Sequence, residues 1–213
     1  MVIVRLPPPT GGISPQYITL NSGDELIRIF DPTQYGAKAI CEAVSFRNSF
    51  RNYGPISRFD HHREHPNKID PDRSVIYAGQ TLSCCLVEVF GDGDVIEIKQ
   101  QQIAFFTLTT SLKLLDLRGS GAMGAGTIAA ISAITQRDIS QTWGRYFYEN
   151  PQLYGAIEGL IFSGAHNCED VVMLYERAKP KIESAKVQVI NLNHPDFLER
   201  ILETAKTHGL VVK

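Results

Sequence analysis

Five polar residues lie within or at the end of short apolar segments. They are Arg28 in LIRIF, Arg58 in GPISRF, Tyr77 in VIYAG, Glu88 in CLVEVF and Ser163 in GLIFSG. A guanidinium can bind two phosphate oxygens at once, a carboxylate can stabilise a developing positive charge, and an aromatic ring can stack on a flat cation. A hydroxyl can orient a bound group by hydrogen bonds. Each residue alone also has an ordinary structural role, such as a surface ion pair or a core position.

Such chemistry needs elements that bring these residues together. Glu25–Phe30 and Ser74–Ala78 are rich in β-branched and aromatic residues and are predicted to be strands. Residues Thr81–Phe90 are predicted to form a helix with Thr81 as its N-cap. At about 100° per residue, Glu88 falls on the flank of the apolar face of this helix, where it can be presented to a cleft. That apolar face comprises Leu82, Cys85, Leu86 and Val89.

The rest of the chain alternates between strands and helices with short connections. Consecutive strands joined by polar turns favour an α+β domain, with mixed sheets flanked by helices. The predicted strands are VIEIK (95–99), IAFFTL (103–108), LKLLDL (112–117), EGLIFS (158–163), DVVMLYE (170–176) and KVQVINL (186–192). The predicted helices are Thr127 to Arg137, Ser140 to Tyr148, and Asp196 to His208 before Gly209.

The composition is that of one soluble domain. Residues 1–20 are rich in proline and glycine, so we expect an extended arm there and a single domain over residues 21–213. Residues 45–74 are too polar and too broken by proline and glycine for a core, and long irregular segments inside a compact domain are often functional.

The charge balance limits the partners. The 21 basic and 23 acidic residues give a net charge of −2. This balance provides no overall field for a nucleic acid or an anionic membrane, so any anion must be held by a few placed groups. No apolar stretch approaches the ~18 residues of a membrane span. The N-terminus has Arg5 and a proline run where a signal peptide needs apolar residues. We therefore expect a cytoplasmic protein that contacts neither nucleic acid nor membrane.

A glycine pattern offers a competing interpretation. Gly119, Gly121 and Gly124 spell GxGxxG between a strand and a helix, with Asp138 near the place of a ribose-binding acid. The upstream strands, however, are joined by short turns instead of crossover helices, and Arg118 occupies a position that is usually apolar. A flexible glycine loop is therefore favoured over a Rossmann fold.

A histidine cluster and Ser163 offer two more competing interpretations. His61, His62 and His65 with Glu64 have side chains that suit zinc, but they lack the helical HExxH pattern, and no second cluster completes a tetrahedral site. Ser163 lacks the surrounding GxSxG turn that one large class of serine hydrolases has. The sequence thus predicts no metal site and no bound cofactor.

Taken in order, the five polar residues resemble the RES domain, a family of bacterial toxins named for its Arg, Glu and Ser. The resemblance covers about residues 24–178, with a C-terminal strand and helix (186–208) beyond it, and is most specific from Tyr77 to Glu88 in VIYAGQTLSCCLVE. LIRIF supplies Arg28, GPISRF supplies Arg58, and EGLIFS supplies Ser163. The sequence departs from the family pattern by placing FDHH (59–62) where an aromatic–Asn pair normally follows the second arginine, and by a longer insert before Tyr77.

The resemblance implies an ADP-ribosyltransferase-like fold and an enzyme that consumes NAD⁺ by cleaving its nicotinamide–ribose bond. Glu88 would stabilise the positive charge on the ribose, Arg28 and Arg58 would bind the pyrophosphate, and Tyr77 would stack on nicotinamide. Arg28 and Ser163 would join Glu88 as catalytic residues, Ser163 by holding the ribose or the amide. Phosphate, water and a protein side chain all remain open as the acceptor.

The resemblance also implies a protein partner. RES toxins are usually blocked by an antitoxin with a helix-turn-helix region of the Xre type. A homodimer is left open. The alternative function is a RES-like module that binds a nucleotide or a partner without turnover.

Overall fold

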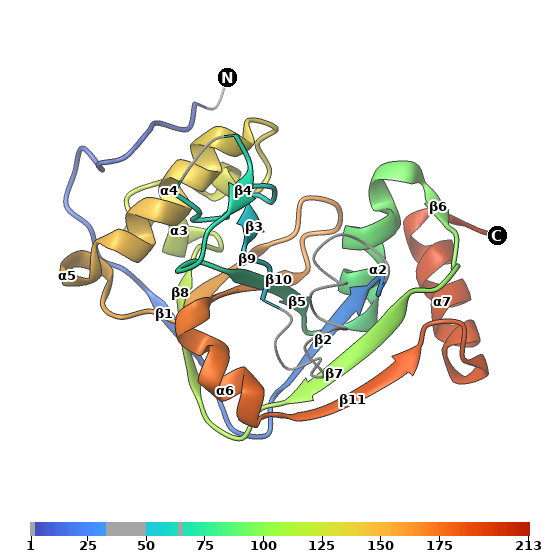
Figure 1. Cartoon of the computed structure of the whole chain (residues 1–213). Coiled ribbons are helices and arrows are strands. Elements are labelled where there is room, and N and C mark those ends of the chain that lie inside the picture. Colours follow the sequence, from blue (N-terminus) through green and yellow to red (C-terminus); the bar gives the residue numbers. More distant parts are fainter. Residues whose placement is uncertain (1–2, 33–49, 64–65) are drawn as a thin grey trace.

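The computed structural model in Figure 1 describes residues 3–32, 50–63 and 66–213. One sheet of eight strands, in the order β1-β8-β9-β10-β5-β2-β7-β11, dominates it. These strands are β1 (Tyr17–Leu20), β2 (Glu25–Phe30), β5 (Val75–Gly79), β7 (Gln102–Thr107), β8 (Leu112–Asp116), β9 (Gly159–Ser163), β10 (Asp170–Tyr175) and β11 (Lys186–Asn191). Two small pairs complete the strands: β3 (Tyr53–Gly54) with β4 (Lys68–Ile69), and β6 (Val95–Ile96) with β12 (Val211–Val212).

The large sheet is mixed, because β8 and β9 are parallel and its other neighbouring strands are antiparallel. Its helices are α2 (Leu82–Phe90), α3 (Ser120–Gly124), α4 (Arg137–Glu149), α5 (Pro151–Tyr154), α6 (Lys179–Ser184) and α7 (Pro195–His208), with 3₁₀ turns at Gly91–Gly93, Ala129–Ser132 and Glu176–Ala178. The predicted α+β class is confirmed. None of the described helices is long and apolar enough to cross a bilayer.

The sheet has a seam between β2 and β5. These two strands pair only at Ile27 and Gly79, whereas β2 pairs with β7 along its whole length, from Glu25 opposite Thr107 to Phe30 opposite Gln102. We call β11-β7-β2 the first half-sheet and β5-β10-β9-β8-β1 the second. Because only one residue pair joins them, the two half-sheets can diverge and leave space between them.

Each half-sheet has its own helices. Helices α2 and α7 lie side by side on the first half-sheet, while α4 and α5 cover one face of the second (Figure 1). Helix α6 packs on the other face, because Ile182 joins Ile76 and Ala78, whereas Val75 and Tyr77 belong to the core under α4. The alternation of side chains along β5 thus separates the two layers.

The N-terminal segment is partly built into the domain. Strand β1 pairs with β8, so the boundary that we expected near Asn21 falls after the first strand of the sheet. Ser14 N–H donates to the Gly124 carbonyl at 2.7 Å, and the Trp143 indole donates to the Arg5 carbonyl at 2.7 Å.

Three predicted elements differ from the structure. The predicted helix from Thr127 to Arg137 is wrong, because only Ala129–Ser132 form a 3₁₀ turn. The flexible loop expected at the glycines is also wrong, because α3 forms there. A Cβ on Gly121 would lie 2.5 Å from the Asp116 carbonyl oxygen, so this helix packs directly on backbone that a side chain would displace. The predicted strand at 95–99 is reduced to Val95–Ile96.

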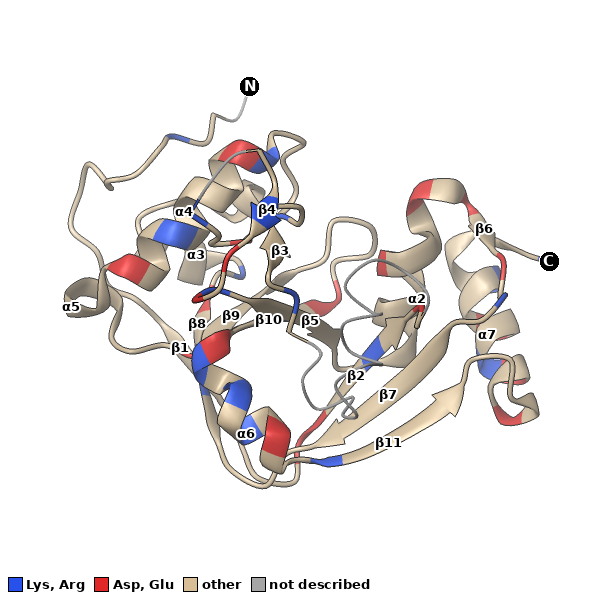
Figure 2. Ribbon diagram, in the orientation of Figure 1, with Lys and Arg blue, Asp and Glu red and all other residues tan. Residues whose placement is uncertain are grey.

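Charged residues of both signs are interspersed on α4, α6 and α7 (Figure 2). This distribution agrees with the near-zero net charge of the sequence. A binding site for an anion must therefore come from particular side chains.

Candidate functional site

A cleft of about 360 Å³ opens at the seam between the half-sheets. Its walls come from β2, β5, α2, the segment before β4, the start of α4, and the chain around the end of β9. The ionisable residues among its lining are Arg28, Arg51, Arg58, Tyr77, Cys84, Cys85, Glu88, Asp92, Arg137 and His166. Four of the five residues predicted from the sequence are therefore brought together.

Arg28 projects from β2 as a cation without a carboxylate partner in the described chain. Its Nη1 donates to the Tyr77 carbonyl at 3.3 Å, and its Nε, which is out of contact with solvent, has no hydrogen-bond partner there. Burial, and then repulsion from Arg51, lower the pKa of Arg28 to about 10, so the group is still charged at neutral pH. Two guanidinium groups lie close together here, and an anion would relieve both their repulsion and their desolvation.

Arg58 forms a second cationic position. Its Nη1 donates to the Ile134 carbonyl. Burial, and then the nearby Arg137, lower the pKa of Arg58, while Glu88 and Asp92 act in the opposite direction. Arg58 therefore lies near both Arg137 and the acidic side of the cleft.

Glu88 provides the acidic side. It projects from the flank of α2, as predicted, with 32% of its side chain exposed. Thr81 caps this helix by accepting a hydrogen bond from Cys84 N–H at 2.9 Å, which confirms the predicted N-cap. Val89 was expected in the core but is 46% exposed and lines the cleft beside Glu88.

Tyr77 is held by hydrogen bonds at its hydroxyl. The hydroxyl donates to Asp60 Oδ1 at 3.0 Å and accepts from Phe59 N–H at 3.2 Å. Burial, followed by the nearby Asp60 carboxylate, raises the pKa of Tyr77 well above its usual range, so the hydroxyl keeps its proton. The ring position is thereby fixed in the cleft wall.

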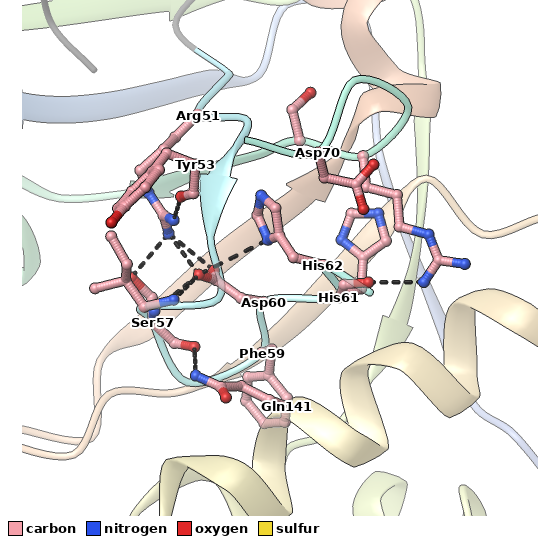
Figure 3. A network of polar contacts seen from close by, with 12 residues as sticks. Arg51, Tyr53, Ser57, Phe59, Asp60, His61, His62, Asp70 and Gln141 are labelled. Carbon is pink, nitrogen blue, oxygen red and sulfur yellow. Dashed lines mark hydrogen bonds and ion pairs between the residues drawn. The ribbon is translucent and has the colours of Figure 1, made fainter. Parts of the chain in front are cut away.

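Asp60 is the centre of the network in Figure 3. Its fully buried carboxylate accepts from Arg51 Nη2 at 2.9 and 2.7 Å, and from the backbone N–H groups of Ile56 at 2.5 Å and Ser57 at 2.8 Å. Arg51 also donates to the Tyr53 carbonyl. One carboxylate thus fixes an arginine of the cleft, the Tyr77 hydroxyl and the backbone just before Arg58.

His61 and His62 serve packing. His61 is buried and its Nε2 donates to Glu176 at 2.9 Å, while His62 is buried against Gly54. In the described ranges no group of three or more His, Cys, Asp or Glu side chains is arranged to hold a metal ion. Glu64 and His65, the other members of the cluster considered from the sequence, lie outside the described residues.

Ser163 is the predicted site residue that does not line the cleft in the described chain. It ends β9 and pairs with Asp170 of β10, while its neighbour Phe162 lines the cleft. Adjacent residues of a strand point to opposite faces, which accounts for the difference.

Apart from Cys84 and Cys85 of the predicted helix, sequence reasoning missed four ionisable lining residues: Arg51, Asp92, Arg137 and His166. Arg51 belongs to the polar segment 45–74, whose irregularity was the one available signal. The other three reach the cleft only because β2 and β5 diverge. The expectation that segment 45–74 stays out of the core is wrong for Phe59, Asp60, His61 and His62, which are buried.

Comparisons with known proteins bear on the family and the fold of the chain. A family model described as the RES domain matches residues 26–198. Among solved structures, the fold is similar to a chain of the crystal structure of the M. tuberculosis MbcT-MbcA toxin-antitoxin complex. The TM-score is 0.54 at 12% sequence identity, and the match covers 86% of this chain and 91% of that one. No curated protein sequence matches the chain.

Proposed function

The chain belongs to the RES domain family, and on this basis we propose that it is an enzyme that cleaves the nicotinamide–ribose bond of NAD⁺. The observation that carries the proposal is the charge distribution of the cleft. Arg28 and Arg58, which have no carboxylate hydrogen-bonded to them in the described chain, share the cleft with Glu88. Such a cleft suits a substrate with an anionic middle and a cationic end.

In the proposed reaction, the bond between ribose C1′ and the nicotinamide nitrogen breaks first. The electron pair leaves with the nitrogen, so nicotinamide becomes neutral and the positive charge moves to the ribose. Glu88 stabilises that charge, while Arg28 and Arg58 hold the pyrophosphate. A lone pair of the acceptor then forms the new bond to C1′, and a proton carried by the attacking atom is released to solvent.

The neighbouring residues support binding and orientation. Tyr77, whose hydroxyl is fixed by Asp60, offers its ring to the nicotinamide before cleavage. We give Ser163 no contact in this proposal, because it does not line the described cleft.

Nicotinamide release from NAD⁺ tests the proposal directly. Purified protein is incubated with NAD⁺, with and without inorganic phosphate, and the products are separated by chromatography. A phosphorylated ribosyl product, free ADP-ribose, or ADP-ribosylated protein identifies the acceptor. Binding of NAD⁺ without any product would instead support the non-catalytic module.

Glu88→Gln is the decisive variant. It keeps the size of the side chain and removes the charge, so we expect nicotinamide release to fall by about 100-fold or more. Glu199→Gln, at an exposed position of α7, is the matched control and should release nicotinamide like the wild type. Near-wild-type release by Glu88→Gln would contradict the role of this carboxylate.

We further propose that the protein is the toxin of a toxin–antitoxin pair, with a helix-turn-helix antitoxin that covers the cleft. The family and the likeness to a chain of a toxin–antitoxin complex support this. Expression in bacteria should lower cellular NAD⁺ and arrest growth, whereas Glu88→Gln should do neither. Normal growth with full expression of the wild type would contradict this part.

A further inference from the structure

His166 lies between two carboxylates at the mouth of the cleft. Its Nδ1 is 3.3 Å from Glu88 Oε1, and its Nε2 is 3.0 Å from Asp92 Oδ1. The three residues come from different places: Glu88 from α2, Asp92 from the 3₁₀ turn after it, and His166 from the loop after β9. The contact therefore joins α2 to the loop between β9 and β10 of the second half-sheet.

The two contacts define the charge of the imidazole. A carboxylate oxygen only accepts, so each contact needs an N–H group, and neutral histidine has only one. Both are satisfied together only in the imidazolium form. In agreement, the hydrogen bond with Asp92 raises the pKa of His166 above its usual value, against the effect of burial, and Glu88 adds to the rise. Because both ring nitrogens donate, His166 has no free lone pair and cannot take a proton from the group that attacks C1′.

Two glycines leave the space that this arrangement needs. A Cβ on Gly164 would lie 2.6 Å from Glu88 Oε1, and a Cβ on Gly91 would lie 2.9 Å from His166 Cδ2. Gly93, in the same turn as Gly91, faces open space. A side chain on Gly164 would displace Glu88, and a side chain on Gly91 would displace His166. Either change would separate Glu88 from His166.

We propose that His166 is a positioning residue that holds the Glu88 carboxylate in its reactive position by bridging it to Asp92. A glutamate on a helix flank otherwise samples several rotamers, and ordering it in advance lowers the cost of reaching the transition state. The inference rests on the proposed function, since it explains how the carboxylate of that reaction is kept in place.

The bridge makes the reaction sensitive to pH. The charged groups around His166 are Asp92 and Glu88. Arg58 lies close enough to both carboxylates to interact with them electrostatically. Above its pKa, His166 keeps one N–H and loses one contact. We expect kcat to fall as the pH rises through this value, because Glu88 is then free to leave its position.

The test combines variants with pH profiles of kcat and KM for NAD⁺. His166→Gln should lower kcat by roughly 10- to 100-fold, change KM by less than about threefold, and abolish the alkaline limb. Asp92→Asn should move that limb to lower pH, because it removes the strongest influence that raises the pKa. A limb unchanged in both variants, or a kcat that rises with pH in the wild type, would overturn the proposal.

A pair of glycine variants separates position from charge. Gly91→Ala displaces the imidazole without removing any charge and should lower kcat, whereas Gly93→Ala is the control and should match the wild type. Equal kcat values for the two would count against the proposal.

NMR titration of His166, assigned by His166→Gln, tests the bridge without using activity. We expect a midpoint above 6.5 in the wild type and a lower one in Asp92→Asn; a midpoint at or below 6.5 in the wild type would overturn the bridge. A wild-type protein that releases no nicotinamide would instead overturn the proposed function, and with it the positioning role of His166.

Discussion

Asp60 shows how one residue can organise a binding wall. Burying a carboxylate is unfavourable unless its oxygens are well hydrogen-bonded. Here Arg51, two backbone N–H groups and the Tyr77 hydroxyl satisfy it. Asp60 and Arg51 form an ion pair, and this pair places a guanidinium in the cleft wall without adding net charge.

Arg28 should bind substrate through its two-pronged guanidinium. Arg28→Lys keeps the charge but loses the fork, so we expect KM for NAD⁺ to rise by roughly one to two orders of magnitude. Arg200→Lys, on the exposed face of α7, should leave KM unchanged. Steady-state kinetics measure both. An unchanged KM in Arg28→Lys would mean that Arg28 has a structural role at the seam between β2 and β5 and does not bind substrate.

His62 should make the stability of the protein depend on pH. Burial lowers the pKa of His62 to about 4, against the opposing effect of Asp60, while an unfolded histidine titrates near 6.5. The unfolded chain thus binds the proton first. The free energy of unfolding should fall by on the order of 3 kcal/mol as the pH drops from about 6.5 to about 4.

Urea unfolding at several pH values checks this. His62→Leu has no group to titrate, so its stability should fall less over the same range. If the stability of His62→Leu falls as steeply as that of the wild type, another group is responsible.

Among the elements, α4 approaches the loop that carries Arg58 unusually closely. A Cβ on Gly144 would lie 2.6 Å from the Phe59 carbonyl oxygen, which belongs to rigid backbone. Alanine normally stabilises a helix interior relative to glycine. In contrast, we expect Gly144→Ala to destabilise the protein by about 1–3 kcal/mol, because the helix must move away.

Denaturant unfolding measures this change, and Gly12→Ala, which faces open space, is the control. The shifted helix should also displace Arg58 and raise KM for NAD⁺. Equal stability of Gly144→Ala and the wild type would mean that the loop adjusts without cost.

The elements also show where sequence patterns succeed. Strands β2, β7, β8, β9, β10 and β11, and helices α2 and α7, follow from local patterns of apolar residues and from caps such as Thr81. The failure at residues 127–137 has a tertiary cause. Ile131 reaches the core from a single 3₁₀ turn and needs no longer helix. The helix forms instead at the glycines, where Gly121 packs against the backbone of Asp116.

On the scale of the whole molecule, the site depends on the seam. The sequence identified Arg28, Arg58, Tyr77 and Glu88 because they match a family pattern. It gave no means of finding Asp92 or His166, because only the divergence of the two half-sheets brings them to the same cleft. Long-range pairing of this kind leaves no local pattern.

We expect chelation to leave activity unchanged. In the proposed reaction, two arginines and a carboxylate supply the charges, and His61 and His62 are occupied in packing. Nicotinamide release in excess EDTA should equal release without it. Loss of activity that zinc or another divalent ion restores would point to a metal that this assignment of charges does not include.

The seam also fixes when the cleft can first exist. One wall comes from β2, early in the chain, and another from Phe162, His166 and Val171, which are made much later. At ~5–20 residues per second, a ribosome needs roughly 7 to 30 s to go from Arg28 to Val171. Unfinished copies on the ribosome should therefore be inert, so translation itself would delay any harm from the protein. Nicotinamide release by chains stalled at increasing lengths would show the delay.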